Sequence, residues 1–191
     1  MTNATRAVFL DKDGTLVEDV PYNVDPARVR LASGALDCLR ALDRAGYRLF
    51  VVSKNQSGVA RGYFDERAVR AVERRLRALL RDGGVELDGF YYCPHHPAGA
   101  DARYATACDC RKPAPGMITR ALAEHSIDPR QSWMVGDILD DVEAGRRAGC
   151  RTVLVDNGHE TEWQRTPDRE PDYVAADLRE AGELIVRGWR C

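Results

Sequence analysis

Short runs of apolar residues alternate along the chain with longer segments whose apolar residues recur every three or four positions. Four apolar runs have the length of buried strands, at residues 7–10, 47–52, 132–135 and 151–155. Periodic segments predict amphipathic helices at residues 33–45, 65–82, 117–125 and 178–187. A weaker run at 173–175 is expected, with the helix that follows it, at the edge of the sheet. The alternation predicts an α/β fold around a central, mainly parallel sheet.

The ends of the predicted helices carry recognisable capping residues. Ser33 is placed as the N-cap of the first helix, and Gly46 as the residue that ends it. Asp65 is placed as the N-cap of the second helix, which the pair at 83–84 terminates. The arginines of this second helix are expected on a solvated face.

Two acidic residues follow the first predicted strand. In an open parallel sheet, reactive groups collect beyond the carboxyl ends of the strands, so Asp11 and Asp13 are expected at such a site. A carboxylate at position 11 can attack phosphorus, and one at position 13 can move a proton. Two acids this close predict a bound Mg²⁺. The alternative is a strand that ends in a solvated acidic turn.

The second predicted strand ends in Ser53, followed by small and polar residues up to Gly62. A hydroxyl and backbone N–H groups in such a loop can donate to phosphate oxygens. Further along, Arg111 and Lys112 follow a turn, where a lysine ammonium suits a position between oxygens and an arginine suits a second anion.

Cysteines and histidines flank a loop without an apparent core of its own. Cys93 with His95 or His96, and Cys108 with Cys110, form a C-x-H … C-x-C pattern. Thiolate and imidazole ligands in this number are what a closed tetrahedral Zn²⁺ site prefers. We therefore predict a structural zinc at residues 93–110; reduced thiols beside a stray histidine are the alternative.

Composition narrows the class of protein. The 191 residues predict a single domain over 1–191, and 44% apolar with 30% charged residues is ordinary for a globular chain. A net charge of −2 predicts no nucleic-acid partner. The expectation is a cytoplasmic monomer without a membrane partner, because neither a long apolar span nor a signal sequence is apparent. The 25 arginines against 3 lysines are attributed first to coding bias.

The run of residues 11–15, DKDGT, resembles the first motif of the haloacid dehalogenase superfamily of aspartate-nucleophile phosphatases. Ser53, Lys112 and the GDxxxD run at 136–141 resemble its second, third and fourth motifs. The resemblance implies a Rossmann-like three-layer fold. It also implies Mg²⁺ held by Asp11, Asp13 and Asp137, with support from Thr15 and Asp141; Asp140 is assigned to helix-dipole stabilisation. Residues 16–52 are too few for a large cap, so the fold is expected to be capless.

Three runs extend the resemblance to one branch of the superfamily, which contains D-glycero-D-manno-heptose 1,7-bisphosphate 7-phosphatases and histidinol-phosphate phosphatases. They are residues 55–62, 91–97 and 108–113. The resemblance implies a small phosphorylated sugar as substrate and His95 as the zinc ligand. The expected substrate-binding residues are Asp19, Tyr22, Asn55, Gln56 and Arg111.

One position departs from the branch. Relatives run from a serine or threonine directly into Asn-Gln, whereas Lys54 here stands between Ser53 and Asn55. Either Lys54 bulges outward or it takes part in the site. The predicted function is hydrolysis of the 7-phosphate of the heptose bisphosphate. The alternatives are a histidinol-phosphate phosphatase, a nucleic-acid 3′-phosphatase, and a catalytically impaired, zinc-stabilised binding module.

Overall fold

Six parallel strands form a single sheet at the centre of the molecule. The computed structural model describes residues 5–54 and 57–188. The strands lie in the order β3-β2-β1-β4-β5-β6, with every pairing parallel. Their bounds are β1 Ala7–Leu10, β2 Arg48–Ser53, β3 Gly89–Tyr92, β4 Trp133–Gly136, β5 Arg151–Val155 and β6 Tyr173–Ala175. The predicted α/β class is confirmed, and the sheet is wholly parallel.

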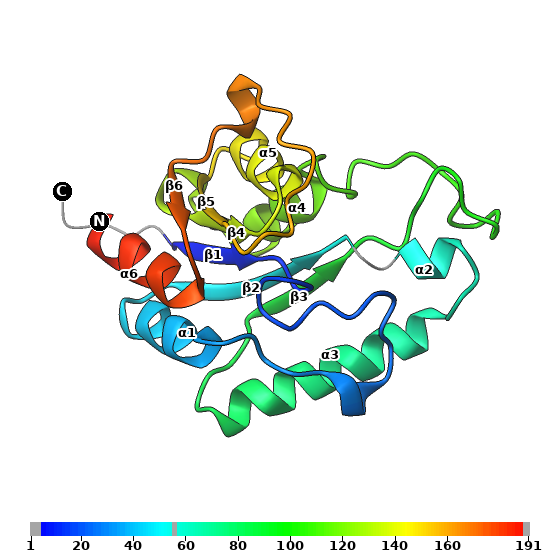
Figure 1. Ribbon diagram of the computed structural model, residues 1–191, viewed down its shortest axis with the longest axis horizontal. Coiled ribbons are helices and arrows are strands. Elements are labelled where there is room, and N and C mark those ends of the chain that lie inside the picture. The colour runs from blue at the N-terminus through cyan, green and yellow to red at the C-terminus, as the bar shows by residue number, and fades with distance from the viewer. Residues whose placement is uncertain (1–4, 55–56, 189–191) are drawn as a thin grey trace.

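Helices cover both faces of this sheet and make three layers (Figure 1). The helices α1 (Ala35–Arg44), α3 (Glu66–Asp82) and α6 (Leu178–Gly188) share one hydrophobic cluster with Val8 and Leu10 of β1. The helix α4 (Gly116–Glu124) packs on the opposite face with Ala7 and Phe9, and Ala144 of α5 (Leu139–Arg147) joins it there. Successive residues of β1 thus point to opposite faces, and both faces are buried, as the continuous apolar run predicts.

The predicted ends of the helices agree with the structure except at the first helix. Asp65 caps α3, its carboxylate accepting a hydrogen bond from the Ala68 N–H. The prediction that Ser33 caps α1 is wrong, because the N-cap is Gly34, which has a φ of 76° and no side chain to accept a bond. The left-handed backbone at this position favours glycine over serine.

The segments that follow the carboxyl ends of the strands build the site. Residues 17–31 form a surface segment whose two ends are joined by an antiparallel bridge between Val17 and Leu31. The segment contains a 3-10 helix at Pro26–Arg28. The segment is too short for a cap domain, in agreement with the prediction. After β2 comes the four-residue helix α2 (Ser57–Ala60), which the sequence pattern did not predict. Within the described residues, no helix combines the length and apolar character needed to cross a membrane.

Candidate active site

Asp11 lies at the end of the central strand β1. Its backbone N–H donates to the Val135 carbonyl of β4 at 2.9 Å, so the strand pairing itself fixes this residue. Gly14 then turns the chain with a φ of 85°. A Cβ at Gly14 would lie 2.3 Å from Asp137 Oδ2, so only glycine lets the two segments approach this closely.

Three buried carboxylates meet beyond the ends of β1 and β4. Oxygens of Asp11, Asp137 and Asp141 lie within 4.8 Å of one another. Burial raises the pKa of Asp11 despite the opposing attraction of Lys112, and the carboxylates of Asp137 and Asp13 add to the rise. Burial and the Asp141 carboxylate likewise raise the pKa of Asp137. Such repulsion between buried acids is relieved by a hard divalent cation with oxygen ligands, so the donor set fits Mg²⁺.

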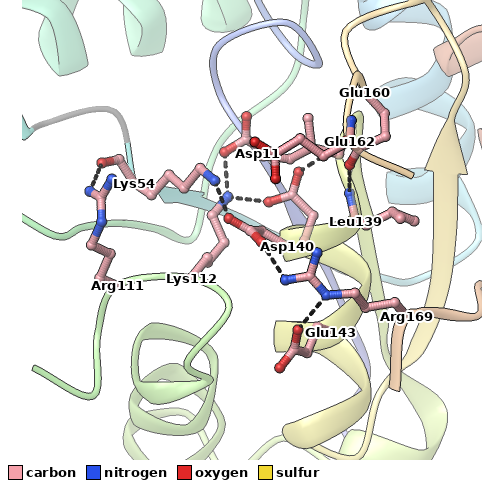
Figure 2. Close-up of polar contacts among 12 residues, drawn as sticks. Asp11, Lys54, Arg111, Lys112, Leu139, Asp140, Glu143, Glu160, Glu162 and Arg169 are labelled. Carbon is pink, nitrogen blue, oxygen red and sulfur yellow. Dashed lines mark hydrogen bonds and ion pairs between the residues drawn. The ribbon is translucent and has the colours of Figure 1, made fainter. Parts of the chain in front are cut away.

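Lys112 inserts its ammonium among these carboxylates (Figure 2). It pairs with Asp11 Oδ1, lies 2.6 Å from Asp141 Oδ1, and donates to the Val52 carbonyl at 2.9 Å. Burial alone would lower the pKa of Lys112, but the two carboxylates outweigh it and raise the pKa. The lysine is therefore charged, and it orients the Asp11 carboxylate from the side of β2.

Asp141 sits on the first turn of α5, directly against the end of β4. A Cβ at Gly136 would lie 2.2 Å from Asp141 Oδ2, so the glycine provides the space for this carboxylate. Burial raises the pKa of Asp141 to about 6, and the Asp11 carboxylate adds to the rise while Lys112 opposes it. Its contact with Lys112 is the arrangement expected of a supporting residue.

Asp13 and Ser53, the predicted proton-transfer and phosphate-binding residues, are both held by neighbouring groups. The Asp13 carboxylate is only 8% exposed and forms an ion pair with the Lys12 ammonium. Ser53 is the fully buried last residue of β2, and its carbonyl accepts from the Cys93 N–H at 3.0 Å. Asn55 and Gln56, predicted to bind substrate, lie outside the described residues.

Asp137 is held by two hydrogen bonds, one of them from Thr15, which was predicted only as a supporting residue. Thr15 Oγ1 donates to Asp137 Oδ1 at 3.0 Å, as expected of a supporting residue. His159 Nδ1 lies 2.6 Å from Asp137 Oδ2. Sequence reasoning missed His159, because it stands in the polar loop after β5, where no periodicity or motif marks it.

The predicted zinc residues converge. Cys93, His95, Cys108 and Cys110 place one ligand atom each within 4.8 Å of the others. Cys110 Sγ lies 3.3 Å from His95 Nδ1, 3.0 Å from Cys93 Sγ and 3.2 Å from Cys108 Sγ. Three sulfur atoms and one imidazole nitrogen in one cluster fit a tetrahedral Zn²⁺.

The neighbouring histidine makes other contacts. His96 Nε2 lies 3.4 Å from Arg61 Nη2, and its Nδ1 accepts from the Ala98 N–H at 3.1 Å. Of the two histidines that the spacing left open, His95 is therefore the one in the metal cluster.

Three of the predicted substrate-binding residues lie among the described residues, and their role in binding stays a prediction. Arg111 Nη1 donates to the Lys54 carbonyl at 3.2 Å. Asp19 is exposed on the 17–31 segment. Tyr22, on the same segment, is 48% exposed, has a φ of 53° and packs edge-on against Tyr63.

A row of alternating charges lies beside the buried carboxylates, and the sequence did not predict it (Figure 2). Its members are Lys54, Asp140, Arg169 and Glu143. Lys54 Nζ lies 2.5 Å from Asp140 Oδ2, and Arg169 Nη2 lies 2.9 Å from Asp140 Oδ1. Arg169 also contacts Glu143 at 2.7 Å. The Asp140 carboxylate thus makes specific ion pairs, beyond the predicted stabilisation of the helix dipole, and Lys54 turns inward across the site.

Comparison with known proteins gives consistent matches. A family model described as HAD-hydrolase-like matches residues 109–181. The chain is 45% identical to the D-glycero-beta-D-manno-heptose-1,7-bisphosphate 7-phosphatase of Haemophilus influenzae, over 95% of this chain and 97% of the relative. It is 42% identical to the protein of the same name from Pasteurella multocida, over 94% and 96% of the two chains.

A solved structure agrees in fold. The crystal structure of D,D-heptose 1,7-bisphosphate phosphatase from B. bronchiseptica, complexed with magnesium and phosphate, superposes with a TM-score of 0.77. The two sequences are 28% identical, and the alignment covers 96% of this chain and 99% of that one.

Proposed function

The chain belongs to the haloacid dehalogenase-like hydrolases, and we propose that it removes the 7-phosphate of D-glycero-D-manno-heptose 1,7-bisphosphate. It is a phosphoric monoester hydrolase. The observation that carries the proposal is the placement of Asp11 between the Lys112 ammonium and the Asp137 carboxylate at the carboxyl end of β1. The near full-length similarity to heptose bisphosphate phosphatases supports this substrate.

The reaction assigns one role to each acid of the first motif. Asp11 attacks phosphorus and forms an aspartyl phosphate, while Asp13 donates a proton to the departing sugar oxygen. Asp13 then takes a proton from the water that attacks the aspartyl phosphate, and inorganic phosphate leaves. Lys112 holds the attacking carboxylate, and the Ser53 hydroxyl, at the end of β2, donates to a phosphoryl oxygen.

The Asp11 carboxylate, the Asp13 main-chain carbonyl and the Asp137 carboxylate would hold Mg²⁺. When bound, the ion neutralises the charge that phosphate brings to these carboxylates. Thr15 and His159 orient the Asp137 carboxylate through both of its oxygens. A magnesium ion in the related crystal structure supports this assignment.

The zinc cluster has a positioning role in this scheme. The four ligands leave no place for a reacting water, so Zn²⁺ there is structural. The cluster ends at Cys110, immediately before Arg111 and Lys112. Zinc therefore fixes the segment that brings Lys112 to Asp11 and Arg111 to the mouth.

Phosphate release from a substrate panel tests the proposal. The purified protein with Mg²⁺ is assayed on the heptose 1,7-bisphosphate, on the matching 7-monophosphate and on histidinol phosphate. We expect kcat/KM for the bisphosphate to exceed that for histidinol phosphate at least about a hundredfold, because a second phosphate adds charge-assisted bonds of ~1.5–3 kcal/mol each. Equal or faster turnover of histidinol phosphate would contradict the proposal.

A further inference from the structure

The lysines of this chain are distributed unlike its arginines. The sequence contains 25 arginines and only three lysines, Lys12, Lys54 and Lys112. The side chains of Lys12, Lys54 and Lys112 are 3%, 17% and 1% exposed, and each pairs with an aspartate at the site. In a chain that uses arginine almost everywhere else, all three compact ammonium groups lie at the phosphoryl site. This makes Lys54 part of that site and not an accidental insertion.

The ammonium of Lys112 is already engaged with protein groups. An ammonium group has three N–H donors and no acceptor. Three acceptors surround Lys112 Nζ: Asp11 Oδ1, Asp141 Oδ1 and the Val52 carbonyl. Two of these contacts are hydrogen bonds and the third is an ion pair with Asp141, so Lys112 is engaged in holding the nucleophile and its supporting carboxylate.

Lys54 has donors to spare. Among the described residues, the acceptor within reach of its ammonium is Asp140 Oδ2, at 2.5 Å. Two of its N–H donors thus remain for a ligand. Lys12 is less free to bind a ligand, because it is the cation paired with the Asp13 carboxylate. The partner of Lys54, Asp140, has a second cation in Arg169 at 2.9 Å. Lys54 can share its charge with an anion while Asp140 stays neutralised.

The backbone of Lys54 is fixed beside the same segment that delivers Lys112. The Lys54 carbonyl accepts from Arg111 Nη1, and the preceding Val52 carbonyl accepts from Lys112. The Lys54 side chain then crosses the mouth to the first turn of α5, where Asp140 adjoins the Asp141 carboxylate that holds Lys112 (Figure 2). Its ammonium is thereby close enough to the Asp141 carboxylate to oppose the rise in the pKa of that group.

We propose that Lys54 is a phosphate-binding residue of this site, whose ammonium, paired here with Asp140, donates to a non-bridging oxygen of the reacting phosphoryl group. Lys112 positions the nucleophile, and Lys54 supplies a second ammonium for the phosphate. Asp140 competes with phosphate for the Lys54 ammonium, and Arg169 stays with Asp140 when Lys54 turns to phosphate. The inference rests on the proposed phosphatase function and adds a residue to it.

Binding of inorganic phosphate, measured by titration calorimetry on the full chain with Mg²⁺, tests the inference without turnover. Lys54→Met should weaken phosphate binding about tenfold or more, the loss of one charge-assisted hydrogen bond. Asp140→Asn is the matched control, because it breaks the same ion pair but leaves the ammonium in place. Its affinity for phosphate should equal or exceed that of the unsubstituted protein.

The two variants together separate a binding role from a structural one. If Lys54 serves only as half of a salt bridge, both substitutions weaken phosphate binding alike, and that result would overturn the proposal. An affinity within twofold of the unsubstituted protein for Lys54→Met would overturn it as well. Thermal melting checks that each variant folds; should Lys54→Met not fold, Lys54→Gln takes its place. If the unsubstituted protein does not hydrolyse the heptose bisphosphate, the proposed substrate is wrong. The phosphate-binding measurement on Lys54 can still be interpreted in that case.

Discussion

Side chains at the ends of β1, β2 and β4 are fixed by backbone geometry as much as by their own contacts. Asp11 is anchored through its N–H, and Gly14 and Gly136 leave room for Asp137 and Asp141. Lys112 then compensates the buried negative charge. A larger residue at either glycine should therefore displace the Asp137 or Asp141 carboxylate and lower activity, although no reacting group is replaced.

Gly14→Ala tests this directly. Its φ of 85° strains any other residue by about 1–2 kcal/mol, and the added Cβ would clash with Asp137 Oδ2. We expect loss of at least about 100-fold in kcat, together with weaker Mg²⁺ activation, measured by phosphate release. Gly84→Ala is the control, since Gly84 has a φ of 76° but open space around its Cβ. It should lose similar stability in chemical denaturation and keep its activity; equal loss of activity in both would refute the explanation.

The residues that sequence could predict are those where a strand ends. Asp11, Ser53 and Asp137 each follow a buried apolar run, so the fold alone brings them together. His159 and the ion pairs of Asp140 could not be predicted, because they join loops far apart in sequence. Their positions depend on how the loop after β5 folds back, and no local pattern encodes that path. The Ser33 cap failed for a local reason, the left-handed backbone of Gly34.

At the level of elements, the loop from β3 to α4 depends on its metal ligands. Residues 98–107 form no helix or strand, and the cluster of Cys93, His95, Cys108 and Cys110 joins their two ends. Closing such a loop through zinc contributes directly to folding free energy.

Cys110→Ser should remove the zinc. Zinc content by atomic absorption should fall from one per chain to near zero, and Tm should drop by at least about 5 °C, given ~2–4 °C per kcal/mol for a chain of this size. Activity should fall too, because Arg111 and Lys112 follow the cluster. Cys150→Ser is the control, since Cys150 is also buried but is not one of the four residues whose ligand atoms converge, and the variant should keep its zinc. Unchanged zinc content in Cys110→Ser would contradict the assignment.

Across the whole molecule, the two candidate metal sites lie on different elements and are assigned different roles. The carboxylate site is built at the ends of β1 and β4, and the thiolate site on the loop after β3. The sequence predicted this division because the ligand types differ, oxygen donors in one and sulfur and nitrogen in the other. Stability and activity should therefore respond to different ions.

Withdrawing each ion in turn checks the division. Dialysis against Mg²⁺-free buffer should abolish turnover and leave Tm within about 2 °C, and added Mg²⁺ should restore the full rate. Treatment with a zinc chelator should lower Tm, and Mg²⁺ alone should then not restore the rate. Full turnover without Mg²⁺, or full recovery of zinc-stripped protein by Mg²⁺ alone, would show that the division is wrong.

Chemical trapping of the covalent intermediate tests the nucleophile most directly. The protein is mixed with the heptose bisphosphate and Mg²⁺, quenched in acid and reduced with borohydride, which converts an aspartyl phosphate to homoserine. Peptide mass spectrometry should find homoserine at position 11, and Asp11→Asn should show neither homoserine nor phosphate release. Homoserine at another aspartate, or turnover that survives in Asp11→Asn, would contradict the assignment of Asp11 as the residue that accepts the phosphoryl group.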